Sequence, residues 1–169
     1  MSLDINIRKA DVADLSDIND IYNYYVANST CVWSVIPCSG IERQEWYEGH
    51  DKGMPILVAE YNGRIVGWGA LSTFREAYTI AGTLDDAIYV HHNFHQQGIG
   101  SRLLKELINI ARKTRLHSIL ANISADQEPS IRLHENFGFE KVAHIRQVGW
   151  KFNKRLDAVY LQLLLKNKE

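Results

Sequence analysis

The chain has 169 residues, of which 46% are hydrophobic and 23% are charged, and its formal net charge is -1. This length and composition are typical of one globular domain with a sizeable core. The balanced charge argues against nucleic acid or an anionic membrane surface as the main partner, because both call for clustered Lys and Arg. No apolar run approaches the roughly 20 residues of a membrane span, and the amino terminus lacks the pattern of a signal peptide.

Two cysteines, Cys31 and Cys38, are too few for a disulfide framework, and their spacing does not match a zinc knuckle. We therefore expect two ordinary thiols in a protein of the reducing cytoplasm.

The amino-terminal part of the chain predicts two helices and a hairpin. Residues 10–29 carry apolar side chains at helical spacing, with an aspartate near the start as the cap. A second, short helix is expected from Ser39. Two β-rich runs in residues 55–72 flank Asn62-Gly63, the strongest short signal for a hairpin turn.

The second half of the chain alternates strands and helices. The expected elements are, in order, a strand at 84–92, a helix after Gly100, a strand at 118–124, a helix at 128–139, and strands at 139–149 and 157–165. Pro129 stands in the first turn of the later helix and Gly138 near its end, as is usual for helices. This order predicts a mixed α/β sheet in one domain over residues 1–169.

A glycine-containing turn joins the strand at 84–92 to its helix. It consists of Gln96, Gln97, Gly98, Ile99, Gly100 and Ser101. The first N–H groups of a helix are unpaired and its dipole is positive there, so phosphate binds well, and glycine lets the backbone approach an anion closely. Taken alone, the pattern fits a tight turn better than a phosphate site. It lacks the Gly-Lys-Ser/Thr of a Walker loop, and Leu103 breaks the dinucleotide fingerprint, which argues against a nucleotide-binding oxidoreductase.

Longer stretches of the chain resemble the GNAT acetyltransferases. The strand, the QQGIG turn, its helix and the later PSIRLHENFGF follow the order of that family. VWS at 32–34, IYVH at 88–91, VGWKF at 148–152 and LDAVYLQL narrow the resemblance to the phosphinothricin and methionine sulfoximine N-acetyltransferase branch. The resemblance covers nearly the whole chain. It implies a single GNAT domain, with a twisted, mostly antiparallel sheet that holds a splayed parallel pair and is flanked by helices.

The resemblance also implies acetyl-CoA as the co-substrate. Its pyrophosphate would lie on the turn at 96–101, and its pantetheine arm would pair with the backbone of Ile88, Tyr89 and Val90 like an added strand. An N–H group of this strand, that of Val90, would polarise the thioester carbonyl. Ser130 and Gln127, which replaces the usual Asn of the branch, match positions that reach the cofactor arm.

No metal is expected. His91, His92 and His95 lie close together in the sequence. Alternation along a strand sends neighbouring side chains to opposite faces, and no carboxylate or cysteine completes a ligand set.

Acetyl transfer to an amine requires a base for the amine and a proton donor for the leaving thiolate. Asp85 is the candidate base, directly or through a water, and stands where the branch has Glu. The residues alone favour the plainer reading that Asp85 and Asp86 are surface carboxylates. His134 matches the family position near the CoA sulfur, and imidazole donates a proton near neutral pH. Neither cysteine falls in a catalytic motif, so we expect direct transfer in a ternary complex.

Five residues are candidates for binding the acceptor. Phe74 and Arg75 match the branch position whose arginine faces the acceptor, and a guanidinium forks well onto a carboxylate. Trp33 and Tyr78 are candidate walls of the pocket. Lys151 lies in a segment that helps to shape the acceptor site, partly across a dimer interface, in the branch. The resemblance therefore implies a small amino-acid-like amine as the substrate and a homodimer.

Two other functions stay open. Ile80 and Arg155 replace aromatic residues that are usual in the branch, which leaves the acceptor undetermined. The first alternative is a protein lysine or amino-terminal acetyltransferase. The second is an acyl-CoA-binding sensor without catalysis, because Asp85 is one methylene shorter than the usual Glu.

Overall fold

The computed structural model describes residues 3–50, 53–75 and 82–165. In these residues the strands are β1 (Asn6–Lys9), β2 (Ile56–Tyr61), β3 (Arg64–Thr73), β4 (Thr83–Val90), β5 (Ser118–Ser124), β6 (Glu140–Lys151) and β7 (Lys154–Leu164). The helices are α1 (Leu15–Asn28), α2 (Gly40–Glu48), α3 (Ile99–Ala111) and α4 (Glu128–Asn136), with short 3-10 turns η1 (Val12–Asp14) and η3 (His92–Phe94). None of these helices is long and apolar enough to cross a membrane.

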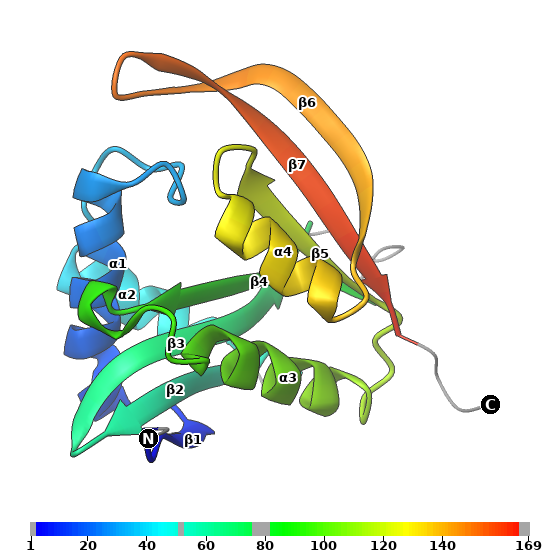
Figure 1. The fold of residues 1–169 in the computed structure, drawn as a ribbon. Helices are drawn as coiled ribbons and strands as arrows, with labels where there is room; N and C mark the ends of the chain where they lie inside the picture. The colour runs from blue at the N-terminus through cyan, green and yellow to red at the C-terminus, as the bar shows by residue number, and fades with distance from the viewer. Residues whose placement is uncertain (1–2, 51–52, 76–81, 166–169) are drawn as a thin grey trace.

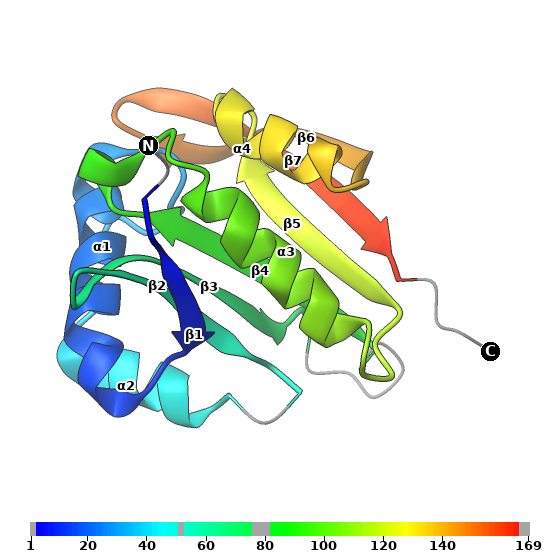
Figure 2. The same ribbon diagram turned by 60° about the horizontal axis from the view of Figure 1, so that its bottom comes forward.

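The seven strands in the described part of the chain form one sheet in the order β1-β2-β3-β4-β5-β7-β6. Neighbouring strands are antiparallel except β4 and β5, which run parallel. Helices α1 and α2 cover one face of the sheet and α3 covers the other, while β6 and β7 form a long hairpin that projects beyond the helices (Figures 1 and 2). The expected mixed sheet with one parallel pair is therefore confirmed.

Two apolar layers hold the helices to the sheet. Helix α1 buries a stripe that includes Ile18 and Ile21 against β2 and β3. Helix α3 buries Leu103, Leu104 and Leu107 in a second layer on the opposite face. Both stripes recur at helical spacing, so the sequence pattern alone fixes which face of each helix turns inward.

The parallel pair β4 and β5 separates after a short contact. The two strands are paired only from Thr83 opposite Ser118 to Asp85 opposite Leu120. Further along, β4 stays paired with β3 and β5 stays paired with β7 on their outer sides. The inner edges of both strands are therefore left without a strand partner.

Main-chain groups of β4 point toward this open edge. The N–H of His91 donates to the carbonyl oxygen of Val66 on β3 at 2.9 Å. Successive N–H groups of a strand point to opposite edges, so those of Val90 and Ile88 point away from β3, toward the side of β5. An extended ligand laid along β4 would find these groups available.

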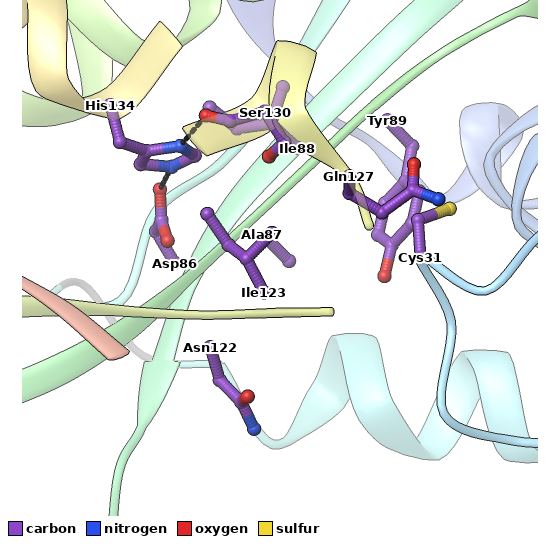
Figure 3. Close-up of a pocket in the computed structure, with 10 residues that line it drawn as sticks. All are labelled: Cys31, Asp86, Ala87, Ile88, Tyr89, Asn122, Ile123, Gln127, Ser130 and His134. Carbon is purple, nitrogen blue, oxygen red and sulfur yellow. Dashed lines mark hydrogen bonds and ion pairs between the residues drawn. The ribbon is translucent and has the colours of Figure 1, made fainter. Parts of the chain in front are cut away.

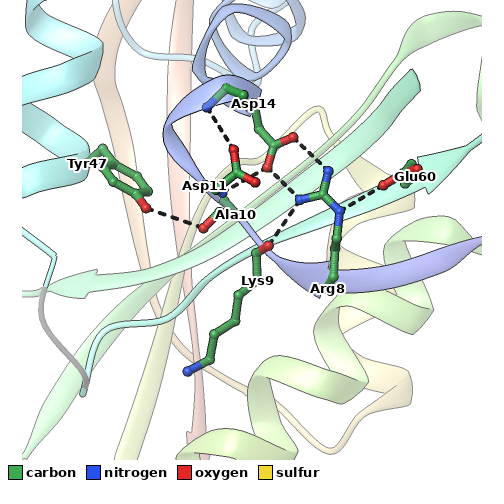
Figure 4. Close-up of polar contacts among 8 residues, drawn as sticks. Arg8, Lys9, Ala10, Asp11, Asp14, Tyr47 and Glu60 are labelled. Carbon is green, nitrogen blue, oxygen red and sulfur yellow. Dashed lines mark hydrogen bonds and ion pairs between the residues drawn. The ribbon is translucent and has the colours of Figure 1, made fainter. Parts of the chain in front are cut away.

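The amino-terminal strand β1 is an element that the sequence analysis missed, and the first helix begins at Leu15 rather than at residue 10. Arg8 on β1 donates to both carboxylate oxygens of Asp14 at 2.7 and 2.8 Å, and to Glu60 on β2 at 2.8 Å (Figure 4). These hydrogen bonds from Arg8 lower the pKa of Asp14 despite its burial. The strand that β1 pairs with, β2, and the Glu60 partner of Arg8 lie about 50 residues further along the chain, so no local pattern reveals β1.

The hairpin between β2 and β3 turns at Asn62 and Gly63, as predicted. Both residues have positive φ angles, of 50° and 74°. Such angles are what a two-residue hairpin turn requires, and Asn-Gly adopts them at low cost. The later strands and helices lie where the sequence predicts them, although β4, α4, β6 and β7 each begin or end up to three residues from the expected positions.

Candidate active site

The turn before α3 forms an open cradle. Gly98 is the N-cap of the helix, with φ of +74° and no side-chain cap, and a Cβ atom at this position would meet nothing within 4 Å. Gln96, Gln97 and Ser101 are exposed around it. The unpaired N–H groups at the start of α3 are thus reachable from outside, as anion binding requires.

Gly100 connects this cradle to the open edge of β4. A Cβ atom on Gly100 would lie 3.3 Å from Leu133 of α4, 3.8 Å from Val90 and 3.9 Å from Ile88. The start of α3, the edge of β4 and helix α4 therefore meet at one place, and the predicted cofactor residues on all three elements are brought together.

A pocket opens where β4 and β5 separate (Figure 3). The residues that line it are Cys31, Asp86, Ala87, Ile88, Tyr89, Asn122, Ile123, Gln127, Ser130 and His134. Five of these, Ile88, Tyr89, Gln127, Ser130 and His134, are predicted site residues. They come from β4 and α4, which lie on opposite sides of the pocket.

His134 is buried in the pocket wall between two partners. Its Nε2 atom lies 2.8 Å from Oδ2 of Asp86, and its Nδ1 atom lies 2.7 Å from the carbonyl oxygen of Ser130 (Figure 3). Burial works against the charged imidazolium, but the charge and hydrogen bond of Asp86 outweigh it, so the pKa of His134 is raised. Both ring nitrogens are thus engaged, and a transfer from Nε2 requires that the contact with Asp86 be given up.

Asp85 lies on the opposite face of β4 from Asp86, opposite Ser72 of β3. Its Oδ1 atom is buried and has no hydrogen-bond partner among the described residues. Burial, with a smaller contribution from the charge of Asp86, raises the pKa of Asp85 to about 6. The plainer reading of Asp85 and Asp86 as surface carboxylates is therefore wrong.

Gln127 belongs to a polar network that links α4 to the end of α1. Its Nε2 atom donates to Oγ1 of Thr30 at 2.7 Å, and Thr30 donates to Asp126 at 2.8 Å. Ser124 also donates to Asp126 at 2.8 Å. The network orients the side chain of Gln127 at the pocket and fixes the start of α4.

Four of the predicted acceptor residues, Trp33, Phe74, Arg75 and Lys151, do not line this pocket. Phe74 and Arg75 follow β3, with the Arg75 guanidinium 5.3 Å from the centre of the Phe74 ring, and Arg75 is exposed. Trp33 packs on the β6–β7 hairpin, since a Cβ atom on Gly149 would lie 2.6 Å from its ring. Tyr78 lies outside the described residues.

Lys151 is buried near the end of β6 and holds the loop after α1. Its Nζ atom donates to the carbonyl oxygens of Val32 at 2.8 Å and Ser34 at 3.0 Å. Burial lowers its pKa. In this arrangement Lys151 joins the loop to the hairpin, which differs from a direct contact with the acceptor.

The histidines near the turn are arranged differently from the sequence expectation. Strand β4 ends at Val90, so His91 and His92 do not alternate between faces, and their rings stack with centroids 4.3 Å apart. Nε2 of His95 lies 2.5 Å from the Tyr25 hydroxyl, which ties the turn to α1. Within residues 3–50, 53–75 and 82–165, no group of three potential ligands is placed to hold a metal ion.

The other five residues that line the pocket were not selected from the sequence, and three of them, Cys31, Asp86 and Asn122, carry a thiol or polar side chain. In the sequence, Asp86 does not differ from a surface carboxylate, and no local motif marks Cys31 as a residue of the pocket. Asn122 is exposed within the otherwise buried strand β5. A single amide in an apolar strand was the signal that would have identified it.

Comparisons with known proteins agree with this geometry. The model of the GNAT acetyltransferase family matches residues 18–139. The L-methionine sulfoximine/L-methionine sulfone acetyltransferase of Salmonella typhimurium is 36% identical over 162 residues, which cover 95% of this chain and 95% of that protein.

Solved structures show the same fold. An acetyltransferase from Salmonella typhimurium, with its cofactor acetyl-CoA, has a TM-score of 0.93 and 35% identity, covering 97% of this chain and 95% of that chain. A ribosomal-protein-alanine N-acetyltransferase from Brucella melitensis has a TM-score of 0.91 and 37% identity, covering 95% of this chain and 99% of that chain. With the splayed strands and the glycine cradle, these matches show that the chain belongs to the GNAT acetyltransferase family.

Proposed function

We propose that this protein transfers the acetyl group of acetyl-CoA to the primary amine of an amino-acid-like small molecule, by direct transfer in a ternary complex. The observation that carries the proposal is Asp85, a buried carboxylate with an unpartnered oxygen and a pKa raised to about 6. A base that titrates close to neutral pH, beside the open edge of β4, is suited to deprotonate an ammonium group.

The chain's main-chain groups bind and orient the co-substrate in this proposal. The N–H groups at the start of α3 hold the pyrophosphate, and the open edge of β4 at Ile88 and Val90 pairs with the pantetheine arm. The Val90 N–H donates to the carbonyl oxygen of the thioester and stabilises the negative charge that develops on it. Gln127 and Ser130 border the arm from α4.

Asp85 and His134 handle the protons. Asp85 takes a proton from the ammonium, directly or through a water, and the free amine attacks the thioester carbonyl. The C–S bond breaks as the amide forms, and the thiolate receives a proton from His134, which regains one from solvent. The amine loses two protons in total and the thiolate gains one, so one proton is released per turnover.

We further propose that Arg75 binds the carboxylate of the acceptor, assisted by Phe74 and Tyr78. Arg75 is exposed and makes no ion pair within the described residues, so its five donors are available to a bidentate partner. The name of the Salmonella relative, which is given for methionine sulfoximine and methionine sulfone, supports acceptors of this size. Phosphinothricin belongs to the same chemical class.

A homodimer and a cytoplasmic location complete the proposal. Strand β6 is an edge of the sheet, and Val142, Ile145, Val148 and Trp150 on it are exposed. A long apolar edge of this kind is normally covered in the functional protein. Both cysteines are free, which suits a reducing compartment.

The test is release of CoA thiol against a panel of amines. The panel contains methionine sulfoximine, methionine sulfone, phosphinothricin, common amino acids, polyamines and peptides with a lysine or an amino-terminal alanine. We expect saturable turnover of the sulfoximine, with KM for it raised about 10- to 100-fold in Arg75→Ala through loss of the bidentate ion pair. Arg64→Ala, which removes an exposed arginine at the hairpin, is the matched control and leaves KM unchanged.

Two other outcomes would support the alternative functions, a protein acetyltransferase or an acyl-CoA-binding sensor. Faster turnover of a peptide than of any free amino acid would identify a protein acetyltransferase. The panel contains peptides because the similar Brucella structure is named a ribosomal-protein-alanine N-acetyltransferase. Tight acetyl-CoA binding without turnover of any amine would favour a sensor and contradict the proposal.

A further inference from the structure

Asp86 has no role in the function proposed above, although it is one of the most buried carboxylates near the pocket. Its side chain is 3% exposed and that of His134 is 4% exposed. The two form a 2.8 Å contact between β4 and α4, at the point where the strands separate. Burying a charged pair is costly unless geometry and hydrogen bonds compensate, so the pair calls for an explanation.

The surroundings of His134 determine where its protons lie. The carbonyl oxygen of Ser130 only accepts, so Nδ1 carries a proton and donates it at 2.7 Å. Nε2 faces the carboxylate of Asp86, which favours a second proton there. The ring of Phe139 packs against the imidazole, perpendicular to it at 5.0 Å between centroids, while His134 still lines the pocket. The imidazole is therefore held in one orientation by contacts on three sides.

We propose that Asp86 is a positioning residue for acetyl transfer, which keeps His134 oriented and protonated so that it supplies the proton to the leaving thiolate. This inference rests on the proposed function and extends it to a residue on the other face of β4 from the base. Asp86 acts only through His134 and does not itself contact the reacting atoms.

Proton transfer begins when Nε2 of His134 gives up its contact with Asp86 and turns its N–H toward the thiolate. The Nε2–H bond then breaks and an S–H bond forms on the thiolate, which leaves a neutral imidazole that still donates from Nδ1 to Ser130. Asp86 remains an anion and favours the return of a proton from solvent to Nε2. Each cycle therefore restores the same imidazolium–carboxylate pair.

Asp86 is the charged group that acts on His134 within the described residues. Burial is the largest single influence on the pKa of His134 and lowers it, whereas Asp86 makes the main contribution that raises it. Cys31 and Tyr89 face the same pocket and are neutral near neutral pH, because burial raises the pKa of both. Asp85 lies on the opposite face of the strand.

The first experiment is an NMR titration of the histidine side chains in the full-length protein and in Asp86→Asn, which keeps the shape of the side chain and removes its charge. We expect the midpoint of His134 to fall by about one pH unit in the variant. His144, which forms an exposed pair with Asp157 at 2.7 Å, provides the internal control resonance. The titration requires no acceptor, so its result is separate from the success of the proposed function.

The second experiment is a double-mutant cycle in kcat, using Asp86→Asn, His134→Gln and the double variant. At about pH 8 we expect Asp86→Asn to lower kcat about tenfold with little change in KM, because less His134 is protonated. The decline of kcat at high pH should begin at lower pH than in the unmodified protein. In the His134→Gln background, Asp86→Asn should change kcat less than about twofold.

A purely structural role would give a different pattern. The melting temperature would fall in Asp86→Asn while the titration of His134 and the pH profile of the folded enzyme stayed the same, and this would overturn the proposal. An equal loss of kcat in the presence and absence of His134 would also overturn it, since Asp86 would then act by another route. If no amine is acetylated, the titration still measures whether Asp86 controls the proton on His134, and an unmoved midpoint rejects the inference.

Discussion

Asp85 and Asp86 are adjacent on β4, but their carboxylates lie in different surroundings. Asp86 faces α4 and pairs with His134, whereas Asp85 faces the other side and leaves Oδ1 buried without a partner in the described chain. Neighbouring side chains of a strand point to opposite faces, so Asp85 and Asp86 lie on opposite sides of the sheet. The shortened arm of Asp85, relative to the usual Glu, keeps the carboxylate close to the strand and in its low-dielectric surroundings.

At the residue scale, Asp85→Asn should lower kcat by about 100- to 1,000-fold, because the amide cannot accept a proton from the amine. In the unmodified enzyme the base must be ionised, so kcat/KM should rise with pH through the pKa of about 6 of the free enzyme. Steady-state kinetics across this pH range measure both effects. A variant with full activity and the same pH profile would show that another group is the base.

Asp85→Asn should lower kcat but increase the stability of the folded protein. The folded state holds a proton on Asp85 more strongly than the unfolded state does, so the carboxylate reduces stability as pH rises from about 4 to about 6, and the cost persists above that. Asp85→Asn should therefore raise the free energy of unfolding by about 1 kcal/mol at neutral pH, after discounting for partial exposure, and by nothing near pH 4. Urea denaturation at the two pH values separates this gain from general damage to the fold.

At the element scale, the unit formed by β4, the turn and α3 presents a main-chain binding surface. Gly98 has φ of +74°, and no atom lies near the position of a Cβ. The left-handed φ is therefore the conformational reason for glycine at this position, since the open space would itself admit a side chain. Gly63 in the β2–β3 turn has the same φ of +74° and the same open surroundings, but lies in the hairpin rather than at the start of α3.

These two glycines allow a matched comparison. Alanine at either position forces a side chain into the left-handed region and should cost about 1 kcal/mol of stability. In Gly98→Ala the methyl group also enters the space proposed for the pyrophosphate, so KM for acetyl-CoA should rise about tenfold. Gly63→Ala should lose the same stability and keep its KM. Equal KM values in the two variants would contradict pyrophosphate binding at this turn.

At the scale of the whole molecule, the β6–β7 hairpin extends the sheet beyond the helices and remains joined to the loop after α1 (Figure 1). Lys151 donates to two carbonyl oxygens of that loop, and Trp33 packs on Gly149. The outer strand, β6, has an apolar row in which Val148 is 56% exposed and Trp150 is 58% exposed. The proposed homodimer would cover this row.

Trp150→Glu should convert the dimer to a monomer, because it places a charge on the apolar edge. Analytical ultracentrifugation across a range of protein concentrations measures the change. Val12→Glu is the control, since Val12 is 61% exposed near β1, at the other edge of the sheet. A monomeric unmodified protein, or a Trp150→Glu variant that remains dimeric, would contradict this assignment.

Most of the element order, the hairpin turn at Asn62-Gly63 and the inward faces of α1 and α3 can be predicted from the amino-acid sequence. These features depend on local φ angles and on apolar spacing, which a short segment carries within itself. The resemblance to the acetyltransferase family also selected five of the residues that line the pocket.

The hydrogen-bond partners and the protonation of the site residues, in contrast, depend on how the whole chain folds. The pairing of Asp86 with His134 joins residues 48 positions apart, and the anchoring of Lys151 to Val32 joins residues 119 positions apart. The raised pKa of Asp85 likewise depends on burial, which packing of the whole chain creates. Burial and long-range contacts are properties of the folded chain, so no local pattern in the sequence distinguishes Asp85 and Asp86 from surface carboxylates.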